Sequence, residues 1–180
     1  MKFISHRGYW KSQNEKNSLA AFRRSFKLGF GTETDIRDRN GELVISHDMP
    51  KGIQLKVKEF FQIYKDSYCD DLLALNIKSD GLQGSLLKLL TEYEIDNYFV
   101  FDMSVPDGVG YLKKRLKVYT RQSEYEKRCS FYEDAIGVWM DEFHSDWITN
   151  EIIQEHLINN KNVCIVSPEL HDRAPEQKWA

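Results

Sequence analysis

Two carboxylates and a histidine in the first third of the chain have types and spacing suited to chemistry. Glu33 and Asp35 are two positions apart, and on a β-strand that spacing aims both side chains at the same face. Six polar, turn-like residues follow, including the hairpin signal Asn40-Gly41, and an apolar run then leads to His47. Paired carboxylates are ligands for a hard divalent cation, and a histidine beside them can transfer protons near neutral pH. The alternative is an ordinary exposed strand face with a structural histidine.

The composition is that of one folded domain over residues 1–180. Hydrophobic residues make up 41% of the chain, enough to fill a core, which argues against disorder. The net charge is −3 and no run of Lys or Arg occurs, which argues against binding to nucleic acid. Three scattered cysteines, Cys69, Cys129 and Cys164, fit neither a disulfide framework nor a zinc site.

The compartment is expected to be the cytoplasm. No apolar stretch reaches the roughly 18–20 residues that a transmembrane helix needs, so no transmembrane segment is expected. The first residues lack the apolar centre of a signal peptide.

Short apolar runs alternate with helical patterns along the chain. Strands are expected over 2–6, around 33–35, and over 72–78, 98–102, 117–121, 135–140 and 162–167. Helices are expected over 17–29, 57–66, 82–93, 105–115 and 147–160. His156 falls in the middle of the last helix and is expected at the surface. Strand and helix in alternation indicate an α/β fold with a parallel sheet, and seven such strands favour a TIM (β/α) barrel.

The polar residues that end these strands also favour a barrel, whose catalytic residues lie at the carboxyl ends of its strands. The candidates at such ends are His6, Lys78, Asp102, Arg121 and Asp141. A complete barrel has about 250 residues, so this one is expected to be abbreviated and to lack its last strand. Either the barrel is truncated, or a homo-oligomer forms in which a partner chain closes it. His144 and Trp147 either line the mouth of the site or cap a helix.

Four segments in order resemble the glycerophosphodiester phosphodiesterase family. They are His6-Arg7-Gly8 and the segments 17–22, 31–35 and 40–48, and a thinner match continues to 166–168. A His-Arg-Gly alone is a weak signal, but the four segments in order make a strong one. The resemblance implies a phosphodiesterase on a TIM barrel related to phosphatidylinositol-specific phospholipase C, with a role in lipid metabolism.

The resemblance also implies roles for individual residues. His6 and His47 would be the catalytic histidines, and Glu33 and Asp35 would hold a divalent metal, Mg²⁺ or Ca²⁺. One histidine would take a proton from the attacking hydroxyl and the other would protonate the leaving oxygen, each contributing about 10²–10⁴-fold. The attacker is either water or a neighbouring hydroxyl of the substrate, so both full hydrolysis and release of a cyclic phosphate stay open.

Two cations near these residues are candidates for binding the phosphate. Arg7 and Lys78 could offset the negative charge that builds on a phosphodiester under attack. Lys78 could equally be a surface cation.

The sequence departs from the family pattern at two places. The third acidic ligand is replaced by Asn76, which offers a carbonyl oxygen without charge, so Asp102 or Asp141 could substitute for it. The family's Glu-Asn-Thr is Lys16-Asn17-Ser18 here. The leading hypothesis is a metal-dependent hydrolase of a glycerophosphodiester or similar polyol phosphodiester. The alternative is a catalytically inactive family member that binds a phosphorylated polyol or sugar.

Overall fold

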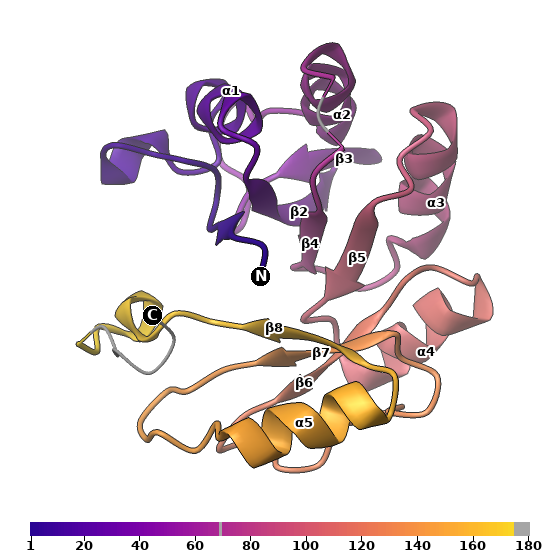
Figure 1. The fold of residues 1–180 in the computed structure, drawn as a ribbon. Helices are drawn as coiled ribbons and strands as arrows, with labels where there is room; N and C mark the ends of the chain where they lie inside the picture. The colour runs from indigo at the N-terminus through magenta and orange to yellow at the C-terminus, as the bar shows by residue number, and fades with distance from the viewer. Residues whose placement is uncertain (69, 175–180) are drawn as a thin grey trace. The chain divides into compact units, whose positions relative to one another are not determined.

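The computed structural model describes residues 1–68 and 70–174, so Cys69 lies outside the described residues. The chain forms two compact units, Met1–Leu116 and Lys117–Ala180. Both consist of parallel strands joined by helices (Figure 1). Among the described residues, no helix has the length and apolar character needed to cross a membrane.

The first unit is built on a five-stranded sheet in which four strands run parallel in the order β1-β2-β4-β5 (Figure 1). These strands are β1 (Ile4–Ser5), β2 (Gly31–Arg39), β4 (Leu73–Ile77) and β5 (Tyr98–Phe101). The helices of this unit are α1 (Leu19–Lys27), α2 (Val57–Asp66), α3 (Gln83–Glu92) and α4 (Val105–Lys113), preceded by a 3-10 turn, η1 (Gln13–Glu15). The expected alternation of strands and helices is confirmed, with boundaries shifted by a few residues.

The predicted hairpin is present, but its turn is shorter than expected. β3 (Glu42–Ile45) pairs antiparallel with the second half of β2, from Ile36 opposite Ile45 to Arg39 opposite Glu42. The turn-like link expected over 36–41 is therefore wrong, because Ile36 is fully buried and keeps the strand going. Asn40 and Gly41 alone make the turn, with φ angles of 53° and 81°.

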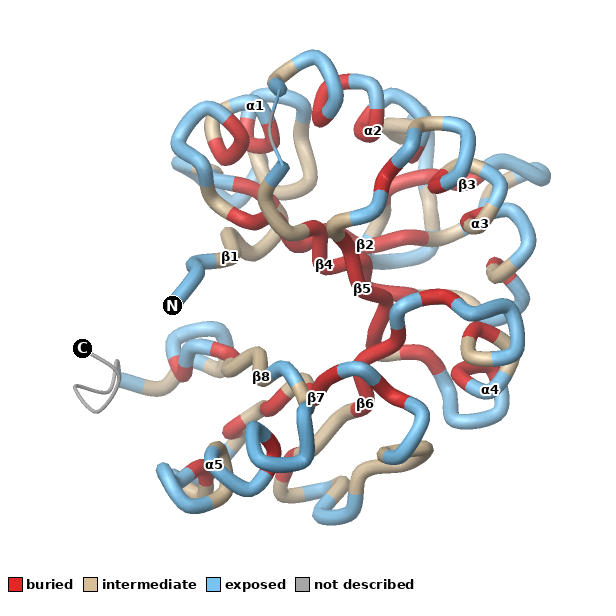
Figure 2. The backbone as a smooth tube through the Cα atoms, turned by 45° about the vertical axis from the view of Figure 1, so that its right-hand side comes forward, coloured by how far each residue is buried: buried red, intermediate tan, exposed pale blue. Residues whose placement is uncertain are grey.

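Aromatic side chains at helical spacing attach α1 and α2 to each other. The ring centroids of Phe22 and Phe60 are 4.6 Å apart, and those of Phe26 and Phe60 are 5.7 Å apart. Ser18 caps α1 by accepting the backbone N–H of Ala21 through its side chain. Figure 2 shows buried backbone along β2, β4 and β5, whose residues form the core of this unit. The buried strand β2 therefore holds its polar residues in fixed positions.

The second unit has a three-stranded parallel sheet in the order β6-β7-β8. Its elements are β6 (Tyr119–Gln122), β7 (Gly137–Met140), α5 (Asn150–Ile158), β8 (Asn162–Ile165) and the 3-10 helix η2 (Pro168–His171). The described residues thus contain the seven parallel-paired strands that were predicted. Arg121 lies at the carboxyl end of β6, as expected, one residue before its last, and its guanidinium is 2.6 Å from the Glu126 carboxylate. Cys129 is a half-buried free thiol.

His156 contradicts the expectation of a surface residue, because only 6% of it is exposed. Its Nε2 is 2.8 Å from Oε1 of Gln122, and its Nδ1 is 2.8 Å from the hydroxyl of Tyr132. A neutral ring satisfies both contacts when Nε2–H donates to Gln122 and Nδ1 accepts from Tyr132. Burial lowers the pKa of His156 below its ordinary value of 6.5.

This buried histidine predicts a loss of stability in mild acid. The unfolded chain binds a proton near pH 6.5 and the folded chain resists it, so folding is favoured above that pH and weakened below it. Urea unfolding should show the free energy of unfolding falling as the pH drops below about 6.5. His156→Gln, which keeps a donor for Gln122, should lose less free energy of unfolding over the same pH range. Equal losses in the parent and the variant would contradict this account of His156.

Candidate active site

Three oxygen-bearing side chains are buried together on the sheet of the first unit. Glu33 and Asp35 lie on β2, and Asn76 lies on β4 directly opposite Asp35 in the parallel register. Their exposed fractions are 1%, 0% and 8%. The two-residue spacing places both carboxylates on the same face of β2, as the sequence indicates.

The three side chains fit a divalent cation by the chemistry of their oxygens. Oε1 of Glu33, Oδ1 of Asp35 and Oδ1 of Asn76 are each buried and accept no hydrogen bond. Buried acceptors without a donor are costly and uncommon in folded proteins. Carboxylate and amide oxygens are the ligands that Mg²⁺ and Ca²⁺ take. In the described ranges no group of three His, Cys, Asp or Glu side chains could hold a metal, so this candidate site depends on the amide oxygen of Asn76 as its third ligand.

The electrostatics of the two buried carboxylates also favour a positive charge bound beside them. Burial, and next the charge of Asp35, raise the pKa of Glu33 to about 8. Arg7 acts in the opposite direction, because its backbone N–H donates to Oε2 of Glu33 at 2.9 Å and its Nε lies 3.0 Å from Oδ2 of Asp35. Arg7, expected as a phosphate contact, therefore contacts both carboxylates in this structure.

A left-handed turn places Arg7 against the carboxylates. Arg7 has a φ of 58°, and Gly8 after it has a φ of 79°. A Cβ atom at Gly8 would lie 2.9 Å from the backbone carbonyl carbon of Ala21 on α1, so only glycine fits. The His-Arg-Gly segment is thus fixed between β1 and α1 by backbone shape as much as by side chains.

Lys78 and Asp102 follow the ends of neighbouring strands and form an ion pair. Nζ of Lys78 donates to Oδ2 of Asp102 at 2.7 Å and is also 3.8 Å from Oδ1 of Asp35. Asp102, considered above as a substitute metal ligand, is therefore a partner of Lys78 here. Lys78 is not an isolated surface cation, since its side chain is 18% exposed.

The two predicted catalytic histidines have different surroundings. Nε2 of His6 is 3.8 Å from Oε2 of Glu33. Burial, followed by the charges of Arg7 and other cations, lowers the pKa of His6 to about 3, so the ring is neutral at neutral pH. His47 is exposed, and its Nδ1 is 2.9 Å from Oδ1 of Asp48, a carboxylate whose pKa this contact lowers. His47 follows β3, which pairs with β2, and His6 lies against Glu33 on β2, so both histidines border the same strand.

Asn17 belongs to this group of residues although the sequence placed it only at the start of the helix expected over 17–29. Its Nδ2 donates to Oδ2 of Asp35 at 2.8 Å, and its Oδ1 accepts from the hydroxyl of Thr34 at 3.0 Å. Its φ of 58° is left-handed, a conformation that asparagine tolerates better than most residues. The available signal was that Asn17 is the unchanged middle residue of the altered Lys16-Asn17-Ser18 segment.

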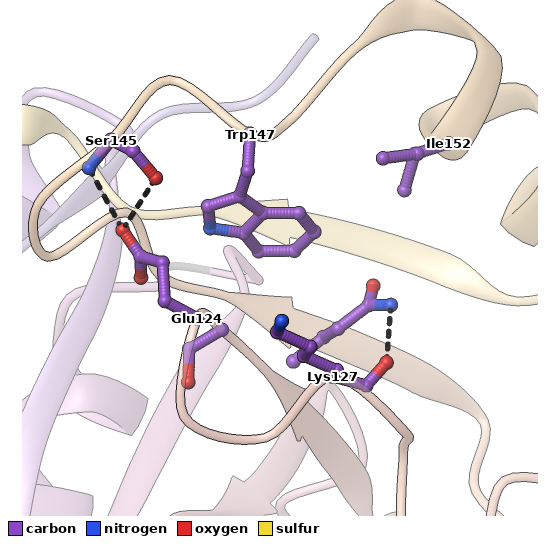
Figure 3. Close-up of a pocket in the computed structure, with 7 residues that line it drawn as sticks. Glu124, Lys127, Ser145, Trp147 and Ile152 are labelled. Carbon is purple, nitrogen blue, oxygen red and sulfur yellow. Dashed lines mark hydrogen bonds between the residues drawn. The ribbon is translucent and has the colours of Figure 1, made fainter.

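A separate cavity of about 510 Å³ lies within the second unit (Figure 3). It is lined by Gln122, Ser123, Glu124, Lys127, Ser145, Trp147 and Ile152. The Glu124 carboxylate accepts backbone N–H groups of Phe143, His144 and Ser145 at 2.8–3.1 Å, so it organises the loop before α5. Thr149 caps α5, which shows that His144 and Trp147 do not.

Comparison with known proteins gives the fold. No protein-family model matches the sequence, and no curated protein matches it. Among solved structures, a Galdieria sulphuraria protein assigned as a glycerophosphodiester phosphodiesterase is 20% identical, with a TM-score of 0.79 over 99% of this chain and 88% of that one.

Two further solved structures agree. The glycerophosphodiester phosphodiesterase of Agrobacterium tumefaciens is 13% identical, with a TM-score of 0.69 over 92% of this chain and 86% of that one. An Oleispira antarctica phosphodiesterase in complex with the product sn-glycerol-3-phosphate is 14% identical, with a TM-score of 0.71 over 93% and 84%. The predicted fold, an abbreviated TIM barrel, is confirmed.

Removing the Asn17 side chain should destabilise the protein. Asn17→Gly keeps the left-handed backbone but removes the amide donor to Asp35 and the acceptor of the Thr34 hydroxyl, which should cost about 1–3 kcal/mol. Asn17→Ala should cost roughly 1 kcal/mol more, because alanine is strained at positive φ. Urea unfolding of both variants measures the two contributions. If Asn17→Gly is as stable as the parent, the contacts of this side chain contribute nothing.

Proposed function

We propose that the chain is a metal-dependent phosphodiester hydrolase of the glycerophosphodiester phosphodiesterase family. Its substrate would be a glycerophosphodiester or a similar small polyol phosphodiester. The observation that carries the proposal is the set of three buried, donor-free oxygens on Glu33, Asp35 and Asn76, next to His6 and Arg7. The fold supports it, because solved structures with this fold are glycerophosphodiester phosphodiesterases.

A divalent cation would be held by Glu33, Asp35 and Asn76. When bound, it would supply positive charge that offsets the anionic oxygens of a phosphodiester. Arg7 and Lys78 place two further positive charges beside the same carboxylates, where they can bind and orient the phosphate.

The two histidines are suited to opposite proton transfers. His6 is neutral, so its ring can take the proton of the attacking hydroxyl, which belongs to water or to the substrate's glycerol. Asp48 holds Nδ1–H of His47, which leaves Nε2 of His47 as the atom that gives a proton to the leaving oxygen. One proton is thus taken and one is given as the phosphorus–oxygen bond to the leaving alcohol breaks.

The alternative function is a family member that binds a phosphorylated polyol or sugar without turning it over. The observation in its favour is Asn76, since an uncharged ligand weakens the binding of a divalent cation compared with a carboxylate. Under either function we expect a small-molecule ligand, no nucleic acid partner and a cytoplasmic location.

Hydrolysis of glycerophosphocholine with added Mg²⁺ or Ca²⁺, followed by phosphorus NMR, tests the proposal. The parent protein should release either glycerol phosphate or a cyclic phosphate, and the two products are distinguished by their spectra. His6→Ala and His47→Ala should each lower the rate by about 10²–10⁴-fold, because each removes a proton-transfer group. Chelation of the metal should stop the reaction.

Gln62→Ala is the control, since Gln62 is exposed on α2 in the same unit and belongs to none of the candidate site residues. It should keep the parent's rate. If His47→Ala is as active as the parent, the proposed mechanism is wrong. Binding of glycerol phosphate with neither turnover nor metal binding would favour the alternative function.

A further inference from the structure

The loop that joins β3 to α2 exposes two large apolar side chains directly after His47. Met49 is 74% exposed and Ile53 is 102% exposed, so neither packs on the rest of the protein. Between them lie Pro50, Lys51 and Gly52. We refer to residues 48–53 as the loop tip. Isolated exposed apolar residues are ordinary, but two on one short tip beside a candidate catalytic histidine are a feature to be explained.

The base of this loop is ordered, so the tip is held outward by structure. The backbone N–H of Ile45 donates to the carbonyl of Leu55 at 2.8 Å, and Val44 forms an antiparallel bridge with Lys56. The Gln54 side chain donates to the carbonyl of Lys51 at 2.7 Å. Ile45 and Val44 are buried at the base. The apolar residues at the base of the loop are therefore buried, whereas those of the loop tip are exposed to solvent.

The charges around the tip leave a positive excess. Lys56 and Lys58 share the carboxylate of Glu42, at 2.7 and 4.0 Å. Lys51 is exposed, and within the described part of the chain it forms no ion pair. The Asp48 carboxylate is held by His47. Two more charged residues touch this segment, since Arg37 donates to the carbonyl of His47 at 3.1 Å and Glu59 accepts the backbone N–H of Lys56 at 2.8 Å. Three lysines and one arginine against three carboxylates give a net charge of +1 around the exposed apolar pair.

We propose that the loop tip docks on a phospholipid bilayer, with Met49 and Ile53 entering the headgroup region and Lys51 at the level of the phosphates. A bilayer accepts separate apolar side chains from a convex tip and favours lysine at its anionic surface. A protein partner would need about 800 Å² of matching surface on each side, which six residues of a protruding tip do not offer.

This docking would bring His47 close to the membrane, because His47 immediately precedes the tip. The substrate would then be a phosphodiester carried by a membrane lipid. That statement about the substrate rests on the proposed function, whereas docking itself does not.

Sedimentation with vesicles tests docking without any need for catalysis. Vesicles of phosphatidylcholine with a minority of phosphatidylglycerol should carry the parent protein into the pellet. The double variant Met49→Ser with Ile53→Ser should bind about 100-fold more weakly, because each of the two apolar side chains contributes about tenfold when it leaves water. Lys51→Gln should weaken binding about fivefold, and only when phosphatidylglycerol is present.

The control is a double variant of two exposed apolar residues elsewhere, Leu28→Ser with Ile158→Ser. These side chains are 54% and 77% exposed, and this variant should sediment like the parent. Equal loss of binding in both double variants would overturn the proposal, as would a parent protein that stays in solution.

The oligomeric state in solution distinguishes membrane docking from dimerisation through the loop tip. If the parent is a dimer in solution that Met49→Ser with Ile53→Ser makes monomeric, the tip joins two copies of the chain and the proposal is overturned. A parent that sediments with vesicles but hydrolyses neither glycerophosphocholine nor the phospholipids of the vesicles would leave docking intact and contradict the proposed function alone.

Discussion

Two carboxylates, Glu33 and Asp35, are held on one strand with almost no access to water. Burying one charge without a partner is expensive, and burying two like charges side by side is worse. The surrounding residues reduce that cost in separate ways. Arg7 contacts both acids, Lys78 approaches Asp35, and Asn17 donates to it. Three acceptor oxygens still lack donors, and this deficit is the physical basis for the proposed cation.

The charges around these carboxylates suit a singly charged anionic substrate. The pKa of Glu33 is about 8, and a bound divalent cation would favour its ionised form. The carboxylates of Glu33, Asp35 and Asp102 then carry three negative charges against the two positive charges of Arg7 and Lys78, which leaves −1. A divalent cation would change the sum to +1, and a phosphodiester carries −1. A carboxylate at position 76 would remove that positive excess, so Asn76 is compatible with binding a phosphodiester even though it holds a metal less strongly.

The sequence was sufficient for the order of the elements and for the acid pair, because both follow from local patterns. Helix 57–66 was predicted with its observed bounds, since its apolar residues repeat at helical spacing. The role of Asn17 was not predictable in this way. It depends on a left-handed backbone and on a partner 18 positions away, and neither produces a periodic pattern in the sequence. His156 was misplaced for a similar reason, because its partners Tyr132 and Gln122 are 24 and 34 positions distant.

Crystals grown with Mn²⁺, which scatters X-rays anomalously, give the most direct test of the central claim. We expect one strong anomalous peak about 2.0–2.6 Å from oxygens of Glu33, Asp35 and Asn76. The Asn76→Ala protein should show a weaker peak at the same place. No peak between these residues, or a peak bound elsewhere with Asn76 facing away from it, would contradict the assignment of the three buried oxygens as metal ligands.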